Sequence, residues 1–525
     1  MTGLLVGVDL GTTGVKTALY APDGTTLAEQ TAPTPLRWYG TGRVDQDPDE
    51  FYRAATATIA ECVRNAGADP REVKAVAVCG QMAGTMGVDA DFRATTPYDS
   101  WLDLRCAGEV AWLERTLGTT LIETCGCPPM VNHLPKILWW KRHDPETFER
   151  TVAWIPPGSY VAGRLAGLSG HEAFIDATYL HFAGLADQRA GAWSDALLAA
   201  VDIPRASLPR IVEPTEVIGG LTAQAAADSG LVAGTPIAAG LGDTAAGTLG
   251  AGLVRPGRLL DIAGTAAILA GSVAEFRPDV DDQTLITMRG AVPGQWVSLA
   301  YLSGGPLLGW LAGLLLGDEY AEHDPGGEAV ASAAGLERLA AAAAMVPAGS
   351  DGLMFLPYLH GRILPSEPSM RGAWLGLHRR HGRGHLARAV LEGVALEYRR
   401  YLEVLAGLHP DLEFSETRVA GGGARSAVWC QVKASALGVP YAGMGRGELS
   451  CWGAALVAGA AVGLFDDLVA AADAAAPCVR VAEPIAADHA VYERLYEVHR
   501  AFEDAVVAPY RALDRLLTTD VEVRA

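Results

Sequence analysis

The sequence lacks the features by which membrane and exported proteins are recognised. Glycine, proline or a charged residue interrupts each of its strongly apolar stretches, although half of its 525 residues are hydrophobic. Residues 1–3 lead directly into an apolar segment, without the basic region, apolar core and cleavage site of a signal peptide. We therefore expect a soluble, cytoplasmic protein that has no membrane partner.

Cysteine is scarce and scattered, which argues against a disulfide framework. Among the eight cysteines the only close pair is Cys125 and Cys127, and no second pair matches it. The pattern predicts that the cysteines pack in the core, with a metal or redox role as the alternative.

Positive charge is also in short supply. The formal net charge is −20, and lysine and arginine do not gather into a basic stripe. Such a protein would repel the phosphate backbone of a nucleic acid. We expect a small-molecule ligand and no nucleic acid partner.

Two common nucleotide-binding signatures are missing as well. The sequence has no G-x-x-x-x-G-K-[ST] phosphate loop and none of the protein-kinase signatures. These absences exclude the two commonest nucleotide-binding folds at the level of motifs. The length predicts two domains of about 200 to 250 residues each.

What the sequence does contain begins with an unusual turn in residues 4–20. An apolar strand carries Asp9, breaks into the run Gly11-Thr12-Thr13-Gly14, and resumes as a second apolar strand after Lys16. A simple hairpin would keep a carboxylate out of a buried strand. The segment therefore predicts that something polar docks at the bend.

The next segments alternate between strand and helix. Asp47 and Pro48 give the start signal of a helix, and residues 73–80 form a buried strand with a polar exit at Gln81. A further strand, residues 236–239, leads to Gly242-Asp243 and a helix rich in glycine and alanine. Ligands of open α/β sheets collect at such strand ends.

Residues 259–269 repeat the order of the opening segment. Asp261 lies in an apolar strand, Gly264-Thr265 forms the bend, and an apolar strand follows. The repeat suggests a duplicated α/β unit with one Gly-Thr bend in each domain and a ligand between them. Chance similarity of two glycine turns is the alternative.

A third glycine-rich turn lies in residues 418–441, where a strand breaks at Gly421-Gly422-Gly423 and enters a helix. Backbone N–H groups can approach a ligand there because no Cβ is in the way. Packing of the helix on the strand is the alternative. Taken together, two bends for a polyphosphate, a glycine junction for a nucleotide and isolated acids at strand ends suggest phosphoryl transfer, which needs positioning, Mg²⁺ and a base.

Five motifs in these regions resemble the FGGY family of carbohydrate kinases, which have the actin-like ATPase fold. They are VGVDLGTTGVKTALY, GLGDTAAGTLGAG, FLPYLHGR, RAVLEGVALEY and AGGGARSAVW, and the similarity runs in order from about residue 4 to residue 465. Within the family, GQMAG and SWLDLR are similar to sugar-pocket segments of the xylulose kinases. The resemblance implies ATP and Mg²⁺ as cofactors and a sugar or polyol as substrate.

The resemblance also implies roles for individual residues. Asp243 matches the catalytic base, and Asp9 matches the acid that holds Mg²⁺ together with Asp243. The implied ATP site consists of Gly11, Thr12, Thr13, Gly264, Thr265, Gly421, Gly422, Gly423 and Ala424. The implied sugar pocket consists of Gln81, Met82, Ala83, Trp101, Asp103 and Arg105, together with Asp243.

Three positions depart from the family pattern. Ala83 stands where a xylulose kinase has His, GRILP (361–365) replaces Gly-Glu-Arg-Thr-Pro, and Ser435 stands where Asp is usual. Ala83 would leave a larger and less polar pocket beside Met82. The acceptor, a ketose or a polyol, therefore stays open.

We expect an α/β protein with a two-domain, actin-like (ribonuclease H-like) fold and a ligand cleft between the domains. Residues 1–250 would form the sugar-binding domain with the first phosphate loop, and residues 251–525 the nucleotide-binding domain with a terminal helix over 488–513. That helix carries Val491, Leu495, Val498 and Phe502 at helical spacing, which predicts packing on the core, with a homodimer interface as the alternative. Two other functions would share the loops and acids, namely an actin- or chaperone-like ATPase and a sugar sensor without turnover.

Overall fold

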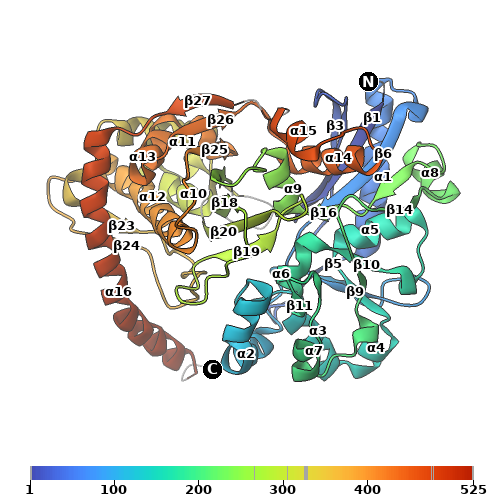
Figure 1. Cartoon of the computed structure of the whole chain (residues 1–525). Coiled ribbons are helices and arrows are strands. Elements are labelled where there is room, and N and C mark those ends of the chain that lie inside the picture. Colours follow the sequence, from blue (N-terminus) through green and yellow to red (C-terminus); the bar gives the residue numbers. More distant parts are fainter. Residues whose placement is uncertain are drawn as a thin grey trace.

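A computed structural model describes residues 3–522 except residues 265, 304, 324–328, 475 and 477. Two large mixed sheets, each of seven strands, organise the chain (Figure 1). The first has the order β14-β15-β6-β1-β2-β3, and β16 pairs with β6 beside β15. Its strands are β1 (Leu4–Leu10), β2 (Gly14–Tyr20), β3 (Thr26–Pro33), β6 (Val73–Gly80), β14 (Val217–Gly220), β15 (Pro236–Ala238) and β16 (Leu241–Gly242).

The second sheet repeats the plan of the first. Its order is β19-β20-β18-β17-β25-β26-β27. In both sheets an antiparallel hairpin, β1/β2 or β17/β18, lies beside a parallel strand, β6 or β25. The strands are β17 (Arg258–Ala263), β18 (Ala266–Val273), β19 (Ile286–Arg289), β20 (Trp296–Ser303), β25 (Glu416–Ala420), β26 (Tyr441–Met444) and β27 (Cys478–Ala482). The repeated order of bends in the sequence thus corresponds to a repeated strand topology.

Helices cover the faces of both sheets. Helix α1 (Pro48–Ala66) begins as predicted, because the Asp47 side chain accepts a hydrogen bond from the backbone N–H of Asp49. The other helices used below are α2 (Ala107–Cys125), α3 (His133–His143), α9 (Asp243–Gly250), α11 (Ala333–Ala344), α12 (Arg383–Leu408), α13 (Ala427–Leu437), α14 (Leu449–Ala461), α15 (Leu468–Ala474) and α16 (Ala486–Glu522). No helix in the described part of the chain is long and apolar enough to span a membrane.

Helix α14 lies between β26 and β27 of the second sheet in sequence but packs on the first sheet, against β1 and β6, and on α9. A Cβ at Gly7 would lie 1.9 Å from the carbonyl oxygen of Cys451, and a Cβ at Gly453 would lie 2.0 Å from that of Ala246. Only glycine permits backbones to approach so closely. Trp452 lies edge-on to Tyr20 of β2, with 5.0 Å between the ring centroids. One hydrophobic cluster therefore contains residues from both halves of the chain.

The terminal helix α16 is longer than predicted, and it turns a different face to the core. Val498 and Phe502 are 45% and 39% exposed, so the predicted packing of that apolar series is wrong at these two positions. The buried face carries Tyr492, His499 and Glu503 instead. These side chains tolerate burial because each has a hydrogen-bond partner on α12 or in the segment before it, residues 355–362.

All eight cysteines are described, and all are free thiols. Seven are buried and Cys478 is partly buried, as expected for core packing.

Candidate active site

Three neighbouring parallel strands bring the predicted acids to one edge of the first sheet. Strand β6 lies between β1 and β16, and Cys79 pairs with Asp9 on one side and with Leu241 on the other. Both β1 and β16 run parallel to β6, so their carboxyl ends lie at the same edge. Asp9 and Asp243, which are more than 230 residues apart in the sequence, are thereby placed close together.

Asp243 is the first residue of α9. Its carboxylate accepts hydrogen bonds from the backbone N–H (2.5 Å) and the hydroxyl (3.1 Å) of Thr244. Burial raises the pKa of Asp243 to about 6. A Cβ on Gly242 would lie 2.3 Å from the terminal carbon of Met82, so Met82 packs directly against the turn that presents Asp243.

Asp9 is partly buried, and the Cys79 thiol donates to its carboxylate over 3.6 Å. Burial and the nearby Asp243 carboxylate raise the pKa of Asp9 to about 7. A divalent cation would offset both the burial of these acids and the repulsion of Asp9 by Asp243. The donor set, two carboxylates, suits Mg²⁺.

The first bend, residues 11–14, is held by two buried amides. The Gln46 amide donates to the carbonyl of Thr12 (3.0 Å), and the Gln81 amide donates to the carbonyl of Gly11 (3.4 Å) and to the Gln46 side chain (3.0 Å). Sequence reasoning missed Gln46, because no spacing links it to the bend. Its only signal is an uncharged amide in a strand that proves to be fully buried.

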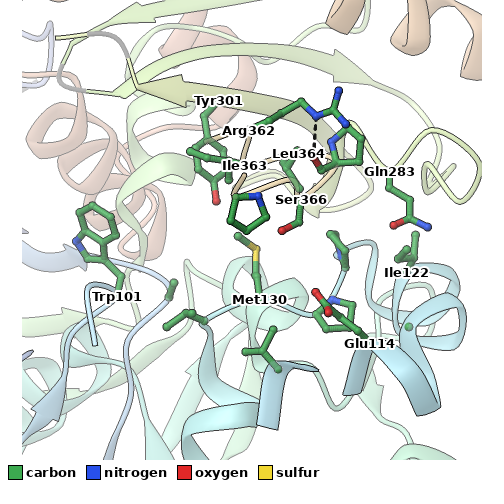
Figure 2. Close-up of a pocket in the computed structure, with 18 of the residues that line it drawn as sticks. Trp101, Glu114, Ile122, Met130, Gln283, Tyr301, Arg362, Ile363, Leu364 and Ser366 are labelled. Atoms are coloured by element: carbon green, nitrogen blue, oxygen red, sulfur yellow. Dashed lines mark hydrogen bonds between the residues drawn. The ribbon is translucent and has the colours of Figure 1, made fainter. Parts of the chain in front are cut away.

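Trp101 connects this bend to the predicted sugar pocket. Its indole N–H donates to the Thr12 hydroxyl over 3.1 Å, and the side chain is 46% exposed. It lines a cavity of about 610 Å³ together with Ala83, residues of α2 and residues 360–368 (Figure 2). Two of the residues expected at the sugar pocket therefore share one cavity.

Asp103 and Arg105 are not brought to the wall of that cavity. Arg105 Nε donates to both Asp103 carboxylate oxygens, at 2.9 and 3.0 Å, and Arg105 Nη2 donates to Asp99. The guanidinium stacks over Trp139 of α3. The ion pair between Asp103 and Arg105 stabilises the loop that carries Trp101, because each side chain neutralises the charge of the other.

The second bend lies beside the glycine-rich junction. A Cβ on Gly421 would lie 2.7 Å from the carbonyl oxygen of Ala263 and 3.4 Å from the N of Gly264. Asp261, the acid of this repeat, is neutralised by Lys433 (2.6 Å) and bonded by Tyr398 (2.9 Å). It is therefore unavailable to a ligand. Thr265 lies outside the described residues.

Two cavities flank the junction. One of about 390 Å³ is lined by Gly422, Gly423 and Ser426 together with residues of α11. The other, of about 520 Å³, is lined by Gly421, Gly422 and Ala424 together with Arg446. The first has an apolar wall and a glycine edge, as a flat aromatic base would need.

Comparisons with known proteins match both halves of the chain to one family. Residues 4–250 match the family model described as FGGY family of carbohydrate kinases, N-terminal domain, and residues 292–462 match the C-terminal domain of that family. A xylulose kinase of Escherichia coli (strain K12) is 30% identical over 445 residues, which cover 83% of this chain and 85% of the relative. The chain belongs to the FGGY family of carbohydrate kinases.

Other members extend the match over the whole length of this FGGY kinase. A xylulose kinase of Bacillus subtilis (strain 168) is 26% identical over 499 residues, 94% of this chain and 96% of the relative. The crystal structure of a xylulose kinase from Rhodospirillum rubrum superposes with a TM-score of 0.87 at 29% identity, covering 97% of this chain and 100% of that one. The kinase has the two-domain actin-like ATPase fold of the family and phosphorylates a sugar with ATP as the phosphate donor.

His133 of α3 contacts the GQMAG segment of the kinase. Its Nε2 lies 2.7 Å from the carbonyl oxygen of Met82. Burial lowers the pKa of His133 to about 4, so the ring is neutral and its Nε2–H donates to that carbonyl. The hydrogen bond fixes the backbone of the GQMAG segment.

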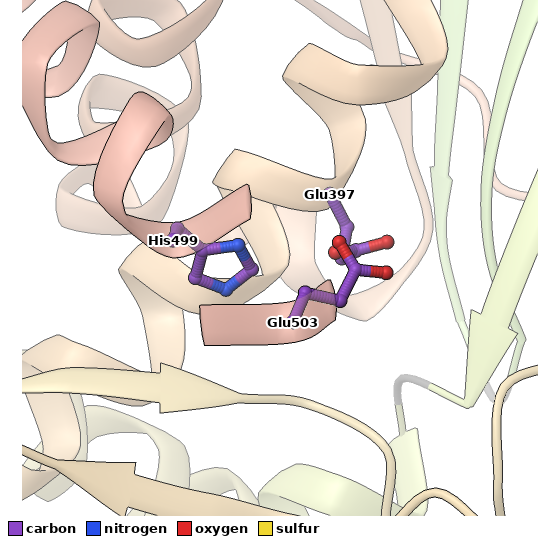
Figure 3. Close-up of side chains that lie close together, drawn as sticks. All are labelled: Glu397, His499 and Glu503. Atoms are coloured by element: carbon purple, nitrogen blue, oxygen red, sulfur yellow. The ribbon is translucent and has the colours of Figure 1, made fainter. Parts of the chain in front are cut away.

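A second cluster of buried polar groups lies in the kinase away from the bends. Glu397, His499 and Glu503 come together between α12 and α16 (Figure 3). Glu503 accepts hydrogen bonds from Arg362 (2.6 Å) and Arg400 (2.7 Å). These guanidinium groups already supply the positive charge that a metal ion would bring, so we interpret the cluster as an anchor of α16.

Proposed function

We propose that this FGGY kinase transfers the γ-phosphate of ATP to a hydroxyl group of a ketose or polyol, with Asp243 as the general base. The observation that carries the proposal is the pair of partly buried acids with raised pKa values, Asp9 and Asp243, between the first bend and Met82. Relatives named xylulose kinase support a ketose as the acceptor.

In this mechanism Asp243 takes the proton of the acceptor hydroxyl as that oxygen attacks the phosphorus. Asp9 and Asp243 would hold Mg²⁺, which neutralises phosphate charge when it is bound. The backbone of Gly11, Thr12 and Thr13 cradles the phosphates from one side. Gly264 and Thr265 are assigned to the other side.

The adenosine is assigned to the cavity beside Gly422 and Gly423, with Gly421 and Ala424 shaping the turn. Gln81, Met82, Ala83 and Trp101 are assigned to the acceptor. Asp103 and Arg105 support the acceptor indirectly, through the loop of Trp101.

The test is Asp243→Asn, assayed by ADP release with D-xylulose and other ketoses and polyols. Loss of a general base lowers kcat by about 10²- to 10⁴-fold, while the affinities for ATP and sugar should stay within several-fold. Asp473→Asn is the matched control, since Asp473 lies on α15 in ion pairs with Arg255 and Arg258. A kcat above about a tenth of the wild-type value would remove Asp243 from its role.

The same assay distinguishes the alternative functions. An actin- or chaperone-like ATPase would release ADP at a rate that sugars do not change, and a sugar sensor would bind sugar without releasing ADP. The comparisons support neither. A homodimer is the assembly that we propose, and sedimentation velocity of the purified chain tests it.

A further inference from the structure

Two of the three departures from the family pattern meet in one cavity. Ala83 follows β6 of the first sheet, and residues 361–365 follow β23 (Met354–Leu356) in the second half of the chain. Both segments line the cavity of about 610 Å³, and Figure 2 shows Ile363 and Leu364 across the opening from Met130. Changes almost 300 residues apart thus alter the same wall.

The charge introduced at residue 362 does not serve this cavity. Arg362 Nη1 donates to Glu503 of α16 (2.6 Å), its Nε donates to the carbonyl of Pro365 (3.0 Å), and its side chain is only 13% exposed. The guanidinium is therefore occupied in holding its own loop and joining it to α16.

Further ion pairs hold this loop in place. Arg511 of α16 donates to Glu367 (2.9 Å), and Arg371 donates to Asp514 of α16 (2.6 Å). A loop attached to a helix at both ends presents a fixed surface between them. That surface consists of Ile363, Leu364 and Pro365.

The inner wall of the cavity is mostly hydrocarbon. Leu364 belongs to the same hydrophobic cluster as Met82, and Met130, Ile363 and Tyr301 pack against that cluster. The Tyr301 hydroxyl is a polar group at this wall, and the Arg362 guanidinium is occupied by Glu503 and Pro365. The other polar side chains at the exposed rim are Glu114, Thr119, Gln283, His360 and Ser366. The inner end therefore offers an entering hydroxyl group few partners.

The cavity is also large for a small sugar. About 610 Å³ is within the range of about 300 to 1,000 Å³ found for pockets that take drug-sized ligands, which are larger than a five-carbon sugar. Asp243 does not line the cavity, so whatever part of an acceptor enters it lies away from the reacting hydroxyl.

We propose that the acceptor of this kinase carries an apolar terminus, a methyl group or a longer hydrocarbon substituent, that sits against Ala83, Met130, Ile363 and Leu364. This inference rests on the proposed function and narrows its substrate class to terminally deoxygenated ketoses or polyols. A hydroxyl group in that place would lose hydrogen bonds to water that the side chains of Ala83, Met130, Ile363 and Leu364 cannot replace, which disfavours the ordinary sugar.

The test compares a six-carbon ketose with its 6-deoxy counterpart, which has a methyl group in place of the terminal hydroxymethyl group. We expect kcat/KM for the 6-deoxy sugar to exceed that of the hydroxylated sugar by about tenfold or more. Equal values, or a lead of the hydroxylated sugar, would overturn the inference.

Two variants separate polarity from size at the wall. Ile363→Thr should reduce the lead of the 6-deoxy sugar to about threefold or less, whereas the matched control Ile363→Val should keep it. KM for ATP should stay unchanged in both. If Ile363→Thr keeps the full preference in kcat/KM for the 6-deoxy sugar, the proposed position of the methyl group is contradicted.

The inference and the function on which it rests fail in different ways. Absence of sugar-stimulated ADP release with every sugar would refute the proposed function. Calorimetric binding of the same two sugars to the wild-type protein without ATP still measures the preference. Equal affinities there, with normal turnover, would refute the inference alone.

Discussion

Adding a methyl group at two adjacent glycines should separate a structural role from a nucleotide-binding role. Gly421 has φ 85° and ψ −173°, a conformation that essentially only glycine adopts, and its Cβ would lie 2.7 Å from the carbonyl oxygen of Ala263. A Cβ on Gly422 would meet no atom within 4 Å, and Gly422 lines the cavity assigned to adenosine. The two positions therefore predict opposite phenotypes.

For Gly421→Ala the cost falls on folding. The backbone conformation costs about 1 to 3 kcal/mol for a residue with a Cβ, and the overlap with Ala263 costs about 1 to 3 kcal/mol more. The sum is about 2 to 6 kcal/mol in the free energy of unfolding. At about 2 °C for each kcal/mol, Tm should fall by about 4 °C or more.

For Gly422→Ala the cost falls on the ligand. The methyl group would stand in the adenosine cavity, and a misfit of about 1 to 3 kcal/mol raises KM for ATP by about five- to 150-fold. Tm and KM for the acceptor should stay at their wild-type values, because the added methyl meets no protein atom.

Differential scanning fluorimetry and coupled ADP-release kinetics on the same preparations give both readouts. An unchanged KM for ATP in Gly422→Ala would show that the nucleotide does not pass this residue. Equal losses of Tm in the two variants would refute the geometric argument.

Three further variants test the supports of the site. Trp101→Phe removes the hydrogen bond to Thr12, so kcat/KM should fall by about fivefold for both ATP and the acceptor, and an effect on one substrate alone would contradict the link between them. Glu503→Gln removes the carboxylate by which α16 holds Arg362 and its loop, so urea unfolding should show a loss of about 3 to 5 kcal/mol, and KM should rise for the acceptor but not for ATP. His133→Gln keeps a donor for the Met82 carbonyl but cannot take up a proton. Because the folded-state pKa of His133 is lowered to about 4 from 6.5, the stability of the wild-type protein falls as the pH drops through this range. Between about pH 7.5 and pH 5.5 the variant should therefore lose about 1 kcal/mol less free energy of unfolding than the wild type, as measured by urea titrations.

The elements that the sequence predicted well are those that local chemistry determines. Asp47 caps α1, and the run of small and β-branched residues before Gly80 is buried on both faces of a strand. The acids at the strand ends could be proposed because parallel strands leave their carboxyl ends at a common edge. The pairing order that places Asp9 beside Asp243 came only with the structure.

The features that the sequence did not reveal depend on partners distant in the chain. Glu503 counts as a surface residue in a helical pattern, yet it is buried because Arg362 and Arg400 reach it from other elements. From the sequence, Asp103 and Arg105 could bind a sugar or form an ion pair with each other. Only the geometry of the structure shows the ion pair. Periodicity records which residues share a face, but not whether that face meets solvent or a matching charge.

The position of α14 has a consequence for biosynthesis. The ribosome completes all strands of the first sheet by residue 242, but the helix that covers the face of β1 and β6 begins only at Leu449. During translation of the intervening 200 or so residues, the face of β1 at Gly7 lacks the helix that covers it in the finished protein. The first half of the nascent chain therefore cannot complete its core until the second half has been synthesised. A fragment ending at residue 250 would expose an apolar surface and should be prone to aggregation.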